Sequence, residues 1–132
     1  MEQISRLIGV YDADGSVLGE LSYVVGHALG RRSCALCDIT HGRIRERPDW
    51  RAARDRLPVP FLTFHRDEVP DDLHVGRVPV VLAETDDGTV ELVQQHELEM
   101  CAGSPEQLVA LIERAVVERG HRWAEGRAIE PD

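Results

Sequence analysis

The chain has 132 residues, a formal charge of -9 and fifteen basic residues, all of them Arg. Lys and Asn are absent, which excludes Schiff-base lysine chemistry, a phosphate-loop lysine and N-glycosylation. The acidic balance argues against nucleic acid as a partner, because a duplex binder needs a basic face that neutralises phosphates. The length fits one domain, which we expect over residues 1–123, with a polar C-terminal tail over 124–132.

The chain carries no sign of a membrane or secretory address. No stretch reaches the roughly 18 apolar residues of a membrane span, and the opening residues lack the apolar run of a signal peptide. We therefore expect a cytoplasmic protein without a membrane partner. The chain has three cysteines, and two of them lie close together at positions 34 and 37. In a cytoplasmic protein this pattern is more typical of reduced, metal-bound or catalytic thiols than of a disulfide framework.

Apolar periodicity and turn residues divide the chain into predicted elements. Apolar runs bounded by turn residues predict strands, apolar residues at helical spacing predict helices, and an Asp-Asp-Gly turn predicts a hairpin. In chain order we expect a strand at about 5–11, a helix at 19–29, two turns of helix between Ser33 and Gly42, a polar helix from Pro48 to about Arg56, a strand at 61–65, a loop or short helix at 67–74, strands at 78–84 and 89–93, and a helix from Ser104 to near Gly120.

Three motifs in this order carry a family resemblance: Cys34-Ala35-Leu36-Cys37, Val78-Pro79, and the Asp86-Asp87-Gly88 hairpin before the Ser104 helix. With them the chain resembles the thioredoxin and glutaredoxin superfamily, and its Tyr11-Asp12-Ala13-Asp14 stretch is similar to the acidic turn of the bacterial DCC thiol oxidoreductases. The resemblance implies an α/β, thioredoxin-like fold with a central four-stranded mixed sheet and flanking helices. An extra helix would be inserted before the Cys-x-x-Cys segment. The resemblance also implies that a cis-proline faces the cysteine pair.

A Cys-x-x-Cys pair at the start of a helix suits redox chemistry. Unpaired amide N–H groups and the helix dipole stabilise a thiolate at Cys34, and Cys37 lies one turn away, where it can resolve a mixed disulfide. Residues 31–56 hold eight Arg and four acidic residues, a local balance of +4 against -13 for the rest of the chain. These arginines either favour a thiolate and an anionic thiol substrate, or form a solvated helix face with partial intrahelical pairing.

We therefore expect a small thiol-disulfide oxidoreductase in which Cys34 attacks and Cys37 resolves. It would act on a protein or small-molecule thiol or disulfide and need no organic cofactor. On the resemblance, Pro79 shapes the substrate groove. The sequence alone leaves open whether the Val78–Pro79 bond is cis, since a trans proline at an edge strand is the commoner case. It also leaves open the substrate, the oligomeric state and the pathway. A third possibility is a binding protein with a thioredoxin-like shape whose thiols are inert.

The alternative function from the same residues is a metal-binding module. Cys34, Cys37 and His41 follow an i, i+3, i+7 spacing and share a helix face, where Cys101 or His96 would complete a zinc or copper(I) site. On the resemblance, the connection that carries Cys101 borders the thiol pair. However, the chain lacks a second Cys-x-x-Cys or His-x-x-x-His pair. Cys101 also fits a buried apolar filler, and His41 fits a dipole partner of its own helix.

Overall fold

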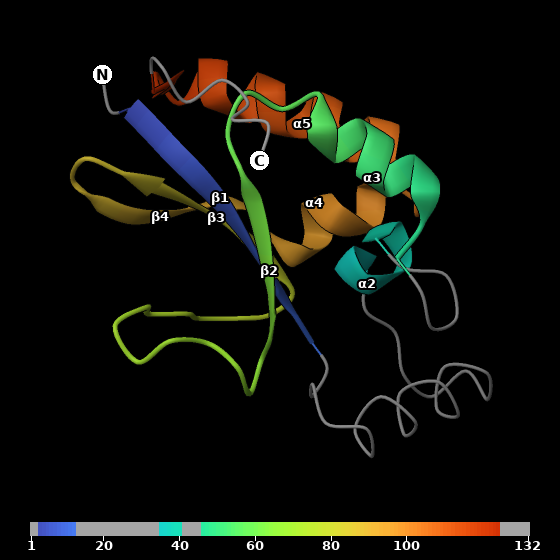
Figure 1. The fold of residues 1–132 in the computed structure, drawn as a ribbon, viewed down its shortest axis with the longest axis horizontal. Helices are drawn as coiled ribbons and strands as arrows, with labels where there is room; N and C mark the ends of the chain where they lie inside the picture. Colours follow the sequence, from blue (N-terminus) through green and yellow to red (C-terminus); the bar gives the residue numbers. More distant parts are fainter. Residues whose placement is uncertain (1–2, 13–34, 41–45, 125–132) are drawn as a thin grey trace.

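The computed structural model describes residues 3–12, 35–40 and 46–124. They form a mixed five-stranded sheet with helices packed on one face (Figure 1), which confirms the predicted α/β class. The elements are β1 (Gln3–Tyr11), α2 (Ala35–Thr40), α3 (Pro48–Asp55), β2 (Phe61–His65), β3 (Val80–Thr85), β4 (Gly88–Val93), α4 (Gln95–Met100), α5 (Pro105–Glu118) and β5 (Arg122–Trp123).

The four longer strands are ordered β2-β1-β3-β4. β1 runs parallel to β2 and antiparallel to β3, and β3 runs antiparallel to β4. The short β5 adds a parallel pairing at the start of β1, where Gln3 and Ile4 face Arg122 and Trp123. Two residues are too short to show strand periodicity, so the sequence did not predict β5.

β1 is the central strand, and its sequence shows why. Leu7, Ile8 and Val10 are all fully buried, as expected for an apolar run that is covered on both faces of a sheet. Leu7 belongs to the core beneath the helices, whereas Ile8 and Val10 belong to a smaller core on the opposite face. The predicted strand at 5–11 is thus confirmed, with two further residues at its start.

In the described part of the chain, a connection rather than a helix covers the opposite face of the sheet. Within residues 66–79, which cross that face in Figure 1, several apolar side chains pack on the smaller core of Ile8, Val10, Val80 and Leu82; they are Val69, Leu73, Val75 and Val78. Of the loop or short helix expected at 67–74, the loop is therefore what the structure contains.

The hairpin between β3 and β4 forms where the Asp-Asp-Gly turn predicted it. Thr85 pairs with Gly88, and Gly88 has a φ of 122°, a conformation that side chains rarely adopt. The Thr85 hydroxyl accepts a hydrogen bond from the Asp87 amide at 3.2 Å and donates one to the Gly88 carbonyl at 2.7 Å. This local network fixes the register of the two strands.

The connection from β4 to the last helix contains a helix that the sequence analysis did not identify. α4 begins after Gln94, whose backbone amide donates to Oε1 of Glu97 at 3.0 Å, half of a capping box. The next helix, α5, begins as predicted, with the Ser104 hydroxyl accepting from the Gln107 amide at 3.2 Å. A Gln-x-x-Glu signal was therefore available for α4.

Several expectations concern other parts of the chain. The helix expected at 19–29 and nearly all of the tail expected at 124–132 lie outside the described residues. The helices expected between Ser33 and Gly42 and from Pro48 correspond to α2 and α3. No helix in the described part of the chain is both long enough and apolar enough to cross a lipid bilayer.

Candidate functional site

The α2 helix is fixed to the carboxyl end of the central strand by a buried hydrogen bond. Tyr11 is the last residue of β1 and Thr40 is the last residue of α2. The Tyr11 hydroxyl lies 2.9 Å from Oγ1 of Thr40. Burial raises the pKa of Tyr11, so the phenol is protonated at neutral pH and can donate. The helix that carries the second cysteine therefore sits at one defined end of the sheet.

Close packing brings α2 onto the sheet. A Cβ atom at Gly9 in β1 would lie 3.1 Å from Cδ2 of Leu36 and 3.0 Å from Cε1 of Phe61. Leu36 is fully buried, and Cys37 is half-buried against the same core. The absence of a side chain at Gly9 lets the Cys-x-x-Cys segment approach the strand this closely.

The two described cysteines differ in state. Cys37 is disulfide-bonded, whereas Cys101 is a buried free thiol, so Cys101 is not the partner of Cys37. Burial, and secondarily the charge of Glu97, raise the pKa of the Cys101 thiol. Its sulfur lies 3.6 Å from the Glu97 carbonyl, to which the thiol donates. Cys34, the predicted attacking residue, lies outside the described residues.

The metal-binding alternative involves Cys34 and His41, which both lie outside the described residues. Among the residues that the structure does describe, no three His, Cys, Asp or Glu side chains are grouped so as to hold a metal ion. His96 is exposed near the start of α4, whereas Cys101 is only 3% exposed and packs in the helix-side core. This burial fits the interpretation of Cys101 as an apolar filler.

The arginines of the basic stretch that the structure describes are paired with carboxylates. Arg51 and Arg54 contact Glu46 at 3.6 and 3.1 Å. The remaining two described arginines of this stretch also contact acids, Arg47 pairing with Asp49 and Arg56 with Glu106, each at 2.6 Å. These pairs compensate the positive charge of the four arginines locally, although Glu46 lies before α3 and Glu106 lies in α5, so the pairing is not mainly within one helix. Arg31, Arg32, Arg43 and Arg45 lie outside the described residues.

Pro79 lies at the same end of the sheet as Tyr11. The Val78–Pro79 peptide bond is cis, and the buried Pro79 directly precedes β3, whose Val80 pairs with Val10 of β1. Next to it is an open groove of about 620 Å³. Its lining comes from the residues around Pro79, from β4 and from the start of α4: Gly76, Arg77, Val80, Glu91, Gln94, Gln95, His96 and Glu99. The sequence analysis identified Pro79 but not this groove, which needs the unpredicted α4.

A histidine and a carboxylate meet beside Tyr11. His65 is the last residue of β2 and pairs in register with Tyr11, and the two ring centroids are 5.3 Å apart. Nδ1 of His65 lies 2.7 Å from Oε1 of Glu68, and the His65 amide donates to the same oxygen at 3.1 Å. The hydrogen bond from the His65 side chain holds the pKa of Glu68 below its ordinary value. The i, i+3 spacing of His and Glu was the available sequence signal for this pair.

Comparisons with models of protein families, with curated proteins and with solved structures find no match. The candidate site is therefore defined by its own geometry. At one end of the sheet the structure brings together α2 with Cys37, the carboxyl ends of β1 and β2, and the Pro79 end of β3. Cys101, the C-cap residue of α4, packs in the helix-side core.

Proposed function

We propose that the protein is a thiol-disulfide oxidoreductase that uses the Cys34–x–x–Cys37 pair. The observation that carries this proposal is the disulfide at Cys37. Because Cys101 is free, this disulfide engages the Cys-x-x-Cys motif through Cys37 and leaves Cys101 out. A pair that closes such a short loop is suited to reversible exchange, because the second thiol is always within reach of a mixed disulfide.

The arrangement of the chain supports a thioredoxin-like fold for this activity. The chain contains, in the order that the resemblance implies, a strand, the helix bearing Cys37, a second strand, a Pro79-initiated strand, its hairpin partner and a helix near the C-terminus, with α3 and α4 as further helices between them. The sheet is mixed, and helices flank one face. Arg77 and Val80, on either side of Pro79 in the sequence, both line the groove, which supports a role for Pro79 in shaping a substrate site.

The proposed exchange proceeds through a mixed disulfide. The Cys34 thiolate attacks one sulfur of a substrate disulfide, forming the mixed disulfide and releasing one substrate thiolate. The Cys37 thiolate then attacks the Cys34 sulfur, which releases the second substrate thiolate and forms the Cys34–Cys37 disulfide. Two electrons pass from the protein to the substrate, and the two product thiolates take up two protons. A dithiol returns the protein to its reduced form by the reverse steps.

The test is exchange with a disulfide-bonded peptide, followed by quenching in acid and mass analysis of the protein. The reduced wild type should reduce the peptide, the Cys34→Ser variant should be inactive, and Cys37→Ser should accumulate the mixed disulfide. Cys101→Ala is the matched control and should keep the wild-type rate within about twofold. A wild type that does not exchange, or one that carries stoichiometric zinc or copper lost in Cys34→Ser, would contradict the proposal.

A further inference from the structure

The groove beside Pro79 lies at the end of the sheet where β3 begins and β4 ends, and several elements line it. Gly76 and Arg77 come from the connection that packs on the smaller core. Glu91 comes from β4, and Glu99 comes from α4 on the helix side of the sheet. At about 620 Å³ the groove has the size of sites that bind small molecules or short peptides.

Two opposite charges line this groove without pairing. Among the described residues, Arg77 and Glu99 have neither an ion-pair partner nor a side-chain hydrogen bond. Most of the described arginines, in contrast, contact a carboxylate, as Arg6 contacts Glu84 at 2.8 Å. A ligand with charge of one sign alone would meet a like charge in the groove, whereas a ligand with both signs can complement both walls. The unpaired charges therefore favour a ligand that carries cationic and anionic groups together.

A second carboxylate in the groove, that of Glu91, is held in place by its neighbours. Its Oε1 accepts a hydrogen bond from Nε2 of Gln94 at 3.2 Å, and Nη1 of Arg119 donates to its backbone carbonyl. Its Oε2 lies beside Gly76, where a Cβ atom would be only 3.2 Å away, and accepts no hydrogen bond from the part of the chain that the structure describes. Since this side chain is already ordered, little conformational entropy is lost when its free oxygen binds a cation.

We propose that the groove binds a short basic peptide with a free carboxyl end. Arg77 binds the terminal carboxylate, because a guanidinium can donate two parallel hydrogen bonds to it. Glu91 and Glu99 bind the two cations of such a peptide, its terminal ammonium group and one basic side chain. The ligand thus carries two positive groups and one negative group, the complement of these three side chains.

This inference goes beyond the proposed thiol exchange and does not depend on it, because none of the residues that line the groove is a cysteine. The test is a titration of the full chain with the dipeptide alanyl-arginine, followed by the amide chemical shifts in NMR spectra. Titrations at low ionic strength avoid screening of the charges, and pH 8 keeps an ordinary imidazole neutral. The largest shifts should occur at residues that line the groove, among them Arg77 and His96.

Three matched ligands each lack one charge of alanyl-arginine. Its N-acetylated form has no ammonium group, alanyl-citrulline has no guanidinium, and the C-terminal amide has no carboxylate. Each should bind the wild type about three- to fivefold more weakly than alanyl-arginine, the range expected for a charge pair that stays partly in water.

Variants of the groove assign each charge to a residue. In Arg77→Gln, alanyl-arginine and its amide should bind equally, while the two ligands that lack a cation should still bind more weakly. In Glu91→Gln and in Glu99→Gln, the preference for alanyl-arginine over one of those two ligands should disappear, and the preference for the free carboxylate should remain. Glu113→Gln and Arg114→Gln, at exposed positions of α5 outside the groove, are the matched controls and should bind as the wild type does.

Several results would overturn this inference. If alanyl-arginine does not bind, or if all four ligands bind the wild type equally, the groove does not recognise these charges. Shifts confined to residues outside the groove would place the peptide elsewhere. If Arg77→Gln weakens every ligand by the same factor, Arg77 does not bind the carboxylate; the unfolding temperature of each variant shows whether such a loss reflects folding. Thiol exchange is measured separately with the disulfide-bonded peptide, so failure of either proposal is visible on its own.

Discussion

The hydroxyl oxygen of Tyr11 and Oγ1 of Thr40 lie 2.9 Å apart and join the last residue of β1 to the last residue of α2. Thr40 is one of only two buried polar residues in the described part of the chain. Such a contact is specific, because a buried hydroxyl that loses its partner is costly. This bond therefore determines where α2, and with it Cys37, rests against the sheet.

Removal of this bond should destabilise the protein without disturbing its fold. We expect Tyr11→Phe and Thr40→Val each to lower the free energy of unfolding by about 1–2 kcal/mol, since each removes the hydrogen bond between these two buried hydroxyls. The double variant should cost less than the sum of the two single variants. Thr40→Ser keeps the hydroxyl and should lie closer to the wild type. Urea unfolding measures all four; strictly additive effects would show that the two hydroxyls are not coupled.

A second contact, at Gly9, determines how closely α2 approaches the sheet. In Gly9→Ala the new methyl group would meet Phe61 and Leu36 at 3.0 and 3.1 Å. Phe61 packs edge-to-face against the buried Trp50, with ring centroids 5.0 Å apart, and so has little room to yield. We expect a loss of about 1–3 kcal/mol, typical of overpacking. Adding Leu36→Ala to Gly9→Ala should recover part of the lost stability. A Gly9→Ala variant that is as stable as the wild type would contradict the close approach of Leu36 and Phe61 to Gly9.

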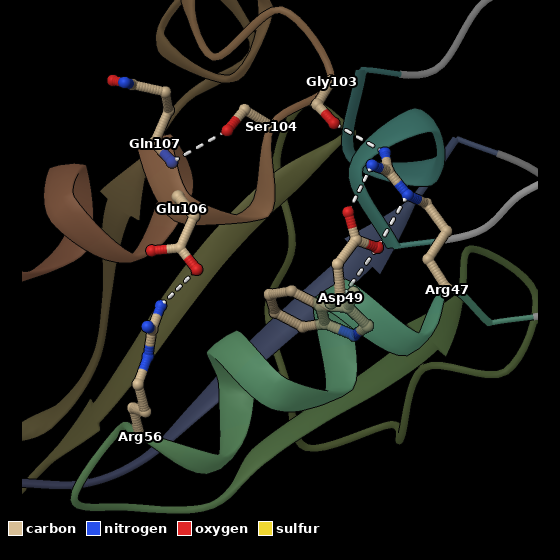
Figure 2. A network of polar contacts seen from close by, with 8 residues as sticks. Arg47, Asp49, Arg56, Gly103, Ser104, Glu106 and Gln107 are labelled. Atoms are coloured by element: carbon tan, nitrogen blue, oxygen red, sulfur yellow. Dashed lines mark hydrogen bonds and ion pairs between the residues drawn. The ribbon is translucent and has the colours of Figure 1, made fainter.

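The arginines that tie α3 to the start of α5 should contribute unequally (Figure 2). Arg47 contacts Asp49 with two nitrogens and donates from Nη1 to the Gly103 carbonyl at 2.6 Å. Arg56 contacts only Glu106 among the described residues, and their side chains are 56% and 67% exposed. An exposed pair of this kind typically contributes about 0–1 kcal/mol and is screened by salt.

We therefore expect Arg47→Ala to lower the free energy of unfolding by more than Arg56→Ala does. The Arg47 variant also loses the bond to the Gly103 carbonyl, which salt does not screen in the same way. Unfolding in 0.05 M and 0.5 M NaCl separates the contributions: the effect of Arg56→Ala should nearly disappear at high salt, whereas most of the Arg47→Ala effect should persist. Equal losses for the two variants at both salt concentrations would contradict this ranking.

The sequence predicted the elements that depend on local signals. The 61–65 strand, the hairpin closed by Gly88 and the Ser104 helix start all have periodicity or turn chemistry within a few residues. It did not predict β5, which exists only because β1 offers a neighbouring edge. The meeting of Tyr11 with His65 and with Thr40 likewise follows from sheet order and helix packing, which connect positions far apart in the chain.

The same distinction applies to the candidate site. Short motifs were enough to identify Cys34, Cys37 and Pro79. The net charge of +4 over residues 31–56 did not reveal the pairing of its arginines. The four described arginines of that stretch are each paired with a carboxylate: Arg47, Arg51, Arg54 and Arg56. Cys101 could be assigned to the core only once α4 and its burial were known. Charge counted along a chain does not show pairing in space, so the count alone could not tell that the positive charge of these four arginines is compensated locally.

The burial of Cys101 predicts how stability depends on alkaline pH. Burial, and secondarily the charge of Glu97, raise the pKa of the Cys101 thiol above its ordinary value of 9.0, so the folded state holds the thiol proton more tightly than the unfolded state does. This contribution is fully present below pH 9.0 and is lost as the pH rises through the higher folded value. Burial also raises the pKa of Tyr11 above its ordinary value of 10.0, so ionisation of Tyr11 lowers the free energy of unfolding further at still higher pH.

We therefore expect the oxidised protein to lose stability above about pH 9 and the Cys101→Ala variant to lose less over the first pH unit. At pH 7 the variant should itself be about 1 kcal/mol less stable, because the sulfur leaves a small cavity. Tyr11→Phe isolates the second contribution, since it removes the phenol and leaves the thiol in place. Urea unfolding at pH 7, 9 and 10 measures these differences. If wild type and Cys101→Ala lose stability in parallel from pH 9 to 10, the Cys101 thiol does not contribute to the alkaline loss.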